Sequence, residues 1–168
     1  YVTAGNSLIR ITSGGVKTTV ATVTNAGALL QGLAVMDNGL VAACDSGRHG
    51  ILLINPETGS VSNHTGFNGV GDFTGIENRG ALKGAAKFNQ PSGLAKAGNG
   101  FLIVADSANH RVKVVNAIGT VTNLYGVGSN SWVTGPSTWP GWWDGTVWAP
   151  DVLGTVEARE PKGVAFGQ

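Results

Sequence analysis

The feature that most constrains the fold of this chain is an internal repeat. Residues 31–58 align without a gap with residues 92–119 when Gly32 is set on Gly93. Identical pairs in this alignment include Leu33 and Leu94, Ala34 and Ala95, Gly39 and Gly100, Asp45 and Asp106, Ser46 and Ser107, and His49 and His110. A chain with such self-similarity is built from repeated supersecondary units.

A third copy of the repeat is divided between the two ends of the chain. Residues 1–15 resemble the second half of the repeat, with Arg10 set on Lys113, and residues 161–165 resemble its beginning. The repeat therefore extends over nearly the whole sequence.

Each copy contains four short apolar runs separated by turn residues, the pattern of an antiparallel meander. Apolar residues fall on both faces of the two middle runs, as they do when sheets stack face to face. The expected strands are 33–36, 40–44, 51–54 and 60–64 in the middle copy, 94–97, 101–105, 112–115 and 121–125 in the last, and 164–166, 1–3, 8–11 and 16–23 in the divided one.

One four-stranded meander cannot bury two apolar faces by itself, but several can do so when they stack around an axis. We therefore predict an all-β fold, a single β-propeller region built of four-stranded antiparallel blades over residues 1–168. The predicted strands amount to about three blades, whereas closed propellers typically have 4–8, and we expect six in the closed ring. The blades are predicted at approximately 1–25, 31–66 and 91–126, with the start of a further blade at 161–168.

The composition agrees with short strands and tight turns. Glycine makes up 27 of 168 residues, more than twice the ordinary share of about 7%, and charged residues make up 12%, about half the usual 25%. A net charge of +1 gives no field that attracts nucleic acid, and no apolar run is long enough for membrane insertion. The single Cys44 excludes an intramolecular disulfide. The low charge and the Gly, Ser, Thr and Asn content favour an extracytoplasmic location.

The string PSGLAKAGNGFLIVADSANHRVKVV at 91–115 closely resembles the NHL repeat, and KGAAKFNQP at 83–91 resembles the approach to that repeat. The resemblance is strongest over 84–128 and weakest over 1–25. The middle copy departs from it at Arg48 and Gly50. The resemblance implies that the connectors between blades and the turns between the second and third strands lie on one face.

Two connectors, 66–90 and 126–160, are much longer than a bare blade requires. Connectors of this length in a compact domain are usually functional or mobile. We expect a ligand, carbohydrate or protein, to bind on the face that bears them.

All five tryptophans lie within the second connector. Flat indoles can stack on sugars or grip a protein partner, and neighbouring carboxylates can accept hydrogen bonds. Alternatively, the indoles form a small core for a loop that has no β-ladder, with one aspartate in a structural turn. The candidate ligand-binding residues are Trp132, Trp139, Trp142, Trp143, Asp144, Trp148 and Asp151.

Other polar residues are interpreted as structural. His49 and His110 are expected to bond a turn or a neighbouring blade, and Asp45 and Asp106 to bond their own backbone two residues on. Arg111 is expected to bond an adjacent blade. We interpret four charges of the first connector as a solvated surface: Asp72, Glu77, Arg79 and Lys83.

Two classes of function stay open. The first is a non-catalytic recognition or assembly module with no catalytic residue, metal or cofactor, since no reactive constellation is apparent. The alternative is a propeller enzyme, a lyase or hydrolase with its site at the mouth of the channel.

For assembly, a second copy of the chain would complete a ring of six blades. The alternative is that these residues form part of a longer single chain.

Overall fold

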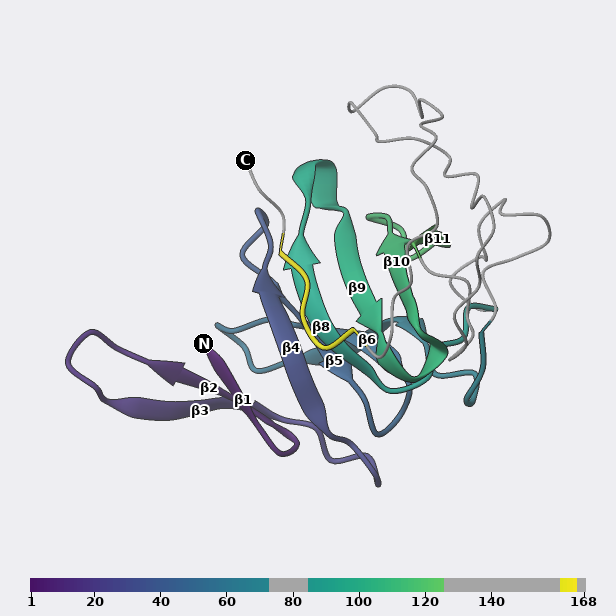
Figure 1. Ribbon diagram of the computed structural model, residues 1–168. Coiled ribbons are helices and arrows are strands. Elements are labelled where there is room, and N and C mark those ends of the chain that lie inside the picture. The colour runs from purple at the N-terminus through teal and green to yellow at the C-terminus, as the bar shows by residue number, and fades with distance from the viewer. Residues whose placement is uncertain (73–84, 126–160, 166–168) are drawn as a thin grey trace.

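The computed structural model describes residues 1–72, 85–125 and 161–165 and contains three antiparallel sheets (Figure 1). The first has the order β1-β2-β3, the second β4-β5-β6-β7, and the third β8-β9-β10-β11. Within the described residues the only helical elements are two 3-10 turns, η2 (Gly98–Gly100) and η3 (Ser107–Asn109). The strands are β1 (Val2–Ala4), β2 (Ser7–Ile11), β3 (Lys17–Thr22), β4 (Leu30–Val35), β5 (Val41–Asp45), β6 (Gly50–Ile54), β7 (Val61–Gly66), β8 (Pro91–Lys96), β9 (Leu102–Asp106), β10 (Arg111–Val115) and β11 (Val121–Tyr125).

The all-β prediction and the four-stranded meander are confirmed. Each of these eleven strands overlaps one that the repeat predicts, and each joins its sequence neighbour in an antiparallel pair. The start of the predicted strand at 164–166 falls in the described segment 161–165, which is not part of a ladder, and its last residue lies outside the described residues.

The sheets stack through two apolar cores, one on each side of the second sheet. On one side, Val41 and Ala43 of β5 pack with Leu8 of the first sheet. On the other side, Ala42 and Cys44 of β5 pack with residues of the third sheet. Because both faces of β5 are covered, successive residues of this strand are all buried, which explains the absence of apolar–polar alternation.

The innermost strands approach each other at glycine. A Cβ added to Gly32 in β4 would lie 2.6 Å from the carbonyl oxygen of Ser92 and 2.8 Å from the Cα of Gly93 in β8. A Cβ added to Gly93 would in turn lie 2.8 Å from the Cα of Gly163. The three glycines are the repeat-equivalent residues of the sequence alignment. In Figure 1 the yellow segment 161–165 runs beside β8, in the place that the next inner strand would take.

The hairpin of the first sheet differs from its counterparts in the length of its turn. Ala4 pairs with Ser7, which leaves two residues in the turn, whereas Asp45 pairs with Gly50, which leaves four. Ile9 pairs with Val2, which lies two residues before the end of β1. In the second sheet, Leu52 likewise pairs with Ala43, two residues before the end of β5.

The alignment of Arg10 with Lys113 is therefore wrong by one residue. Lys113 pairs with Val104, two residues before the end of β9, so its counterpart in the first sheet is Ile9. The shorter turn is the physical reason for the shift.

The glycine approach yields a stability prediction. In Gly32→Ala the new methyl group meets backbone rather than a movable side chain, so we expect the free energy of unfolding to fall by about 1–3 kcal/mol. Thermal unfolding followed by circular dichroism measures this. The matched control is Gly14→Ala, whose Cβ would have only the Thr12 hydroxyl nearby, at 3.9 Å. Equal melting temperatures for the two variants would contradict the tight approach.

Candidate functional site

The first long connector is anchored at both of its described ends. Residues 66–72 and 85–90 run side by side, joined by a parallel bridge between Val70 and Phe88. The amide of Gly71 donates to the carbonyl oxygen of Phe88 at 3.1 Å. The two limbs of the connector thus form one unit before the chain enters β8.

In the second and third blades, the turn between the second and third strands contacts this connector. The His49 carbonyl oxygen accepts from the Phe67 amide at 3.2 Å, and the His49 Nδ1 accepts from the Gln90 amide at 3.1 Å. In the next blade, the amide of Ala108 donates to the carbonyl oxygen of Asn89 at 3.1 Å. The connector and these turns therefore lie on one face, as the resemblance implies. His49 has the expected structural role, because it accepts the amide of Gln90, the residue that precedes β8 of the neighbouring blade.

The repeat-equivalent aspartates bind the chain just before each blade. Asp45 Oδ1 accepts from the amides of Leu29 and Arg48 at 3.0 and 3.1 Å, and Asp106 Oδ1 accepts from the amide of Asn89 at 2.7 Å. Both carboxylates are fully buried. A structural part was predicted, but the expected bond to the backbone two residues on was wrong. Each carboxylate instead accepts the backbone amide of a residue one or two positions before the inner strand of its own blade.

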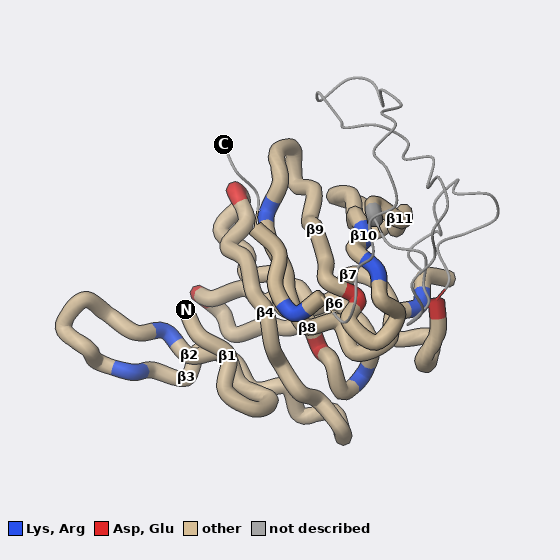
Figure 2. Tube along the Cα trace, in the orientation of Figure 1, with Lys and Arg blue, Asp and Glu red and all other residues tan. Residues whose placement is uncertain are grey.

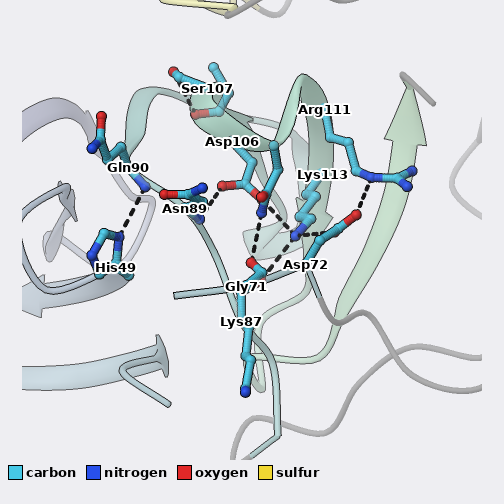
Figure 3. Close-up of polar contacts among 12 residues, drawn as sticks. His49, Gly71, Asp72, Lys87, Asn89, Gln90, Asp106, Ser107, Arg111 and Lys113 are labelled. Atoms are coloured by element: carbon cyan, nitrogen blue, oxygen red, sulfur yellow. Dashed lines mark hydrogen bonds and ion pairs between the residues drawn. The ribbon is translucent and has the colours of Figure 1, made fainter. Parts of the chain in front are cut away.

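A buried lysine joins the connector to the third blade (Figure 3). Lys113 is fully buried, and its ammonium lies 2.6 Å from Asp106 Oδ2, 2.9 Å from Asp72 Oδ1 and 2.9 Å from the carbonyl oxygen of Lys87. These three acceptors match the three donors of an ammonium. Its Nζ also lies 4.9 Å from the centroid of the Phe88 ring. We call Asp72, Asp106, Arg111 and Lys113 the connector cluster.

Asp72 was predicted to be part of a solvated surface, and it does lie exposed at the surface, but it also pairs with two cations of the third blade. It accepts from Lys113 through one oxygen and from Arg111 Nε through the other. Asn109 reinforces the attachment, because its side-chain Nδ2 donates to the carbonyl oxygen of Gly71 at 2.7 Å and to Asp106 Oδ2 at 2.8 Å. Arg111 was expected to bond an adjacent blade, but its ion pair with Asp72 joins it to the connector that precedes its own blade.

The cluster is electrically balanced, with two carboxylates and two cations. Removal from water raises the pKa of Asp106, while the attraction and hydrogen bond of Lys113 oppose that rise. Within the described ranges, no group of three or more His, Cys, Asp or Glu side chains is arranged to hold a metal ion. This arrangement positions a loop, and its carboxylates are already engaged.

The second blade lacks the lysine and uses another donor. Arg48 stands where the third blade has Asn109, and its guanidinium lies 3.4 Å from Asp45 Oδ2. Leu52 stands where the third blade has Lys113, and it packs in the core against the first sheet. Sequence reasoning missed Lys113. The available signal was one lysine inside the apolar run RVKVV at 111–115.

A further histidine, His64, is buried in β7, and its Nε2 lies 3.3 Å from the carbonyl oxygen of Asn116 in the turn between β10 and β11. Charges are sparse along the described trace (Figure 2). Outside the described residues lie the candidate ligand-binding residues Trp132, Trp139, Trp142, Trp143, Asp144, Trp148 and Asp151, and also Glu77, Arg79 and Lys83.

The connector cluster predicts an unequal cost for two lysine substitutions. Lys113→Met leaves Asp106 buried without its cation, so we expect the free energy of unfolding to fall by about 3–5 kcal/mol. The control Lys96→Met breaks the more exposed pair with Asp37, for which about 0–1 kcal/mol is expected. Denaturant unfolding measures both values.

The double variant Lys113→Met/Asp106→Asn separates charge from packing. In this variant the side-chain amide oxygen at position 106 can still accept from the backbone amide of Asn89, and no uncompensated carboxylate stays at position 106. We expect this variant to recover part of the stability lost in Lys113→Met. If the double variant lost as much free energy of unfolding as Lys113→Met and Asp106→Asn lose when their separate losses are added, the pair would not be coupled.

Comparison with known proteins places the repeat in a family. The family model of the NHL repeat matches residues 88–115. A search of curated proteins found no match. No helix of the described residues is long and apolar enough to span a membrane.

Solved structures with a similar fold are longer than this chain. An auxiliary nutrient binding protein from Bacteroides thetaiotaomicron is 16% identical, with a TM-score of 0.60 over 98% of this chain and 38% of its own. A protein of unknown function from the same organism is 14% identical, with a TM-score of 0.61 over 98% of this chain and 38% of its own. A catalytically inactive virginiamycin B lyase from Staphylococcus aureus is 16% identical, with a TM-score of 0.51 over 71% of this chain and 34% of its own.

The chain thus spans between about a third and two fifths of the length of these structures. At such identities the likeness shows the fold. Together with the stacked sheets and the glycine approach, it confirms the resemblance drawn from the sequence: the chain carries an NHL repeat at residues 88–115, within blades of the β-propeller type.

Proposed function

We propose that this chain is a non-catalytic recognition module that binds carbohydrate or protein on the face bearing connectors 66–90 and 126–160. The observation that carries the proposal is the connector cluster. It fastens the first connector to the third blade through Asp72, Lys113 and Arg111. Binding sites are commonly built from loops that a rigid scaffold holds in place.

The energetics of the cluster support a positioning part. Burying a lysine and an aspartate costs several kcal/mol in desolvation, which the pair recovers only with good geometry and further hydrogen bonds. A leucine fills the matching position of the second blade, so the blade itself does not need the charge. The feature that distinguishes the third blade is the long connector attached to it.

Carbohydrate is the ligand class to test first. The tryptophans of the second connector, with Asp144 and Asp151, supply flat apolar faces and hydrogen-bond acceptors of the kind that sugars require. The similar structure named an auxiliary nutrient binding protein supports ligand binding as the function. We also propose an extracytoplasmic location for this chain, on its low charge and its Gly, Ser, Thr and Asn content.

An enzyme is the second candidate. Structures named virginiamycin B lyase and streptogramin B lyase are among those similar in fold, with TM-scores of 0.51 and 0.54. Under this alternative, residues of the connectors would supply a lyase or hydrolase site at the channel mouth. Turnover of virginiamycin B or of an ester by the purified protein would favour it over the recognition module.

The binding proposal predicts that indoles carry the affinity. A glycan array identifies a ligand, and titration calorimetry then compares the protein with Trp142→Ala and Trp143→Ala. We expect at least about a 30-fold loss for one of them, since anchoring aromatic residues contribute about 2 kcal/mol or more. The control is Ile118→Ala, an exposed residue in the turn between β10 and β11, at the end of the blade away from the connector.

Two results would contradict the proposal. One is unchanged affinity in both tryptophan variants. The other is a set of indoles that acrylamide does not quench in the free protein, because buried indoles cannot form a platform. An array without any bound glycan would remove carbohydrate from the proposal and leave protein.

A further inference from the structure

The outermost strand of the second blade contains the sequence signal of a covalent modification. Asn63-His64-Thr65 in β7 is the one triplet of the form Asn-x-Ser/Thr in the chain, the acceptor pattern for N-linked glycans. β7 is the last strand in the order of its sheet, at the opposite end from the inner strand β4. Asn63 is exposed there, so its side-chain amide can carry a bulky group without disturbing the stack of blades.

A bulge in β7 separates the two ends of the triplet. Leu52 pairs with Asn63 and Ile51 pairs with Thr65, so His64 is an extra residue between the two pairs. Asn63 is exposed on one side of the bulge, whereas Thr65 on the other side is only 2% exposed. Because the folded protein buries the hydroxyl of the triplet, an enzyme can bind the whole triplet only before β7 joins its sheet.

The Thr65 hydroxyl serves no visible purpose in the folded structure. Its oxygen is buried and has no hydrogen-bond partner among the described residues. A buried hydroxyl without a partner costs stability, and in a native protein it calls for an explanation. The repeat does not require it, because the counterparts of Thr65 are Ala21 in the first sheet and Tyr125 in the third, neither of which carries a hydroxyl on Cβ.

We infer that Asn63 is a site of N-linked glycosylation, and that Thr65 is the residue by which the transferring enzyme recognises it in the unfolded chain. The inference rests on the proposed extracytoplasmic location and not on the proposed ligand. The donor is an oligosaccharide carried on a lipid pyrophosphate. The Nδ2 atom of Asn63 forms a bond to the anomeric carbon and gives one proton to a base, while the bond from that carbon to the phosphate oxygen breaks and the pyrophosphate leaves with the electron pair.

The position of Asn63 gives the glycan a part in the solubility of the protein. An outer strand presents unpaired backbone groups along its free edge, to which a strand of another molecule can pair. A bulky, solubilising glycan on β7 covers that edge. Asn123, the counterpart of Asn63 in the third sheet, is followed by Leu124 and Tyr125, so the signal is confined to the second blade.

Secretion of the whole chain from a eukaryotic host tests the assignment. We expect an intact mass above 17.1 kDa by one glycan, and peptide mass spectrometry should find aspartate at position 63 after enzymatic release of the glycan. Thr65→Ser keeps the triplet and should be glycosylated, whereas Thr65→Val and Asn63→Gln should have the mass of the bare chain. Folded, secreted protein with an unmodified Asn63 overturns the inference. The tryptophan variants test ligand binding without reference to Asn63, so the two proposals can fail separately.

The second measurement asks whether the Thr65 hydroxyl serves the fold. It is made in the Asn63→Gln background, which carries no glycan. Adding Thr65→Val should raise the melting temperature by at least about 2 °C, because a methyl group replaces a buried hydroxyl that has no partner. The matched control is Thr18→Val at an exposed residue of β3, for which we expect almost no change. An equal or lower melting temperature for Thr65→Val would show that the hydroxyl stabilises the fold, and this result also overturns the inference.

Discussion

The structure depends on the close approach of inner strands at glycine. Gly32 and Gly93 bring the backbones of successive blades to distances that no side chain would permit. Once the inner strands are that close, the sheets lie face to face, and the apolar residues on both sides of β5 are buried, as are Leu102 and Val104 of β9 on the side that faces the second sheet. The high glycine content of the sequence thus serves packing at these positions as well as turns.

Around this apolar stack, polar side chains fix the paths of the connecting segments. Asp45 and Asp106 hold the entry to each inner strand, and His49 holds the amide of Gln90. The third blade adds Lys113, whose ammonium gathers acceptors from both limbs of the connector. Because each acceptor is satisfied by a donor from another segment, the cluster favours one placement of the connector over others.

The sequence alone predicted the strands well because each repeat confirms the pattern of the others. The alignment also set Gly32, Gly93 and Gly163 on one another, but it did not predict that Gly32 approaches Gly93 and that Gly93 approaches Gly163. It failed at Arg10, because an alignment without gaps cannot allow for a turn two residues shorter.

The connector cluster was beyond sequence reasoning for a different reason. Asp72 lies outside the repeat and reaches Lys113 only through the fold, so no spacing in the sequence relates them. Lys113 itself occupies a position where the repeat elsewhere has an apolar residue, and that exception was the one visible sign. The tryptophan connector lies outside the described residues, so its part in binding stays a prediction.

The central claim, that the second and third blades are stacked tightly through their inner strands, can be tested with the single cysteine. Cys44 is fully buried between these blades, and its thiol lies 3.6 Å from the carbonyl oxygen of Gly93. Burial, and then the charges of Asp106 and Asp45, raise the pKa of the Cys44 thiol far above its usual range, so it is unreactive while the blades stay together. The rate of thiol labelling should be negligible in native buffer and rise only with the denaturant concentration that unfolds the sheets. Rapid labelling of the folded protein would contradict the stacked arrangement.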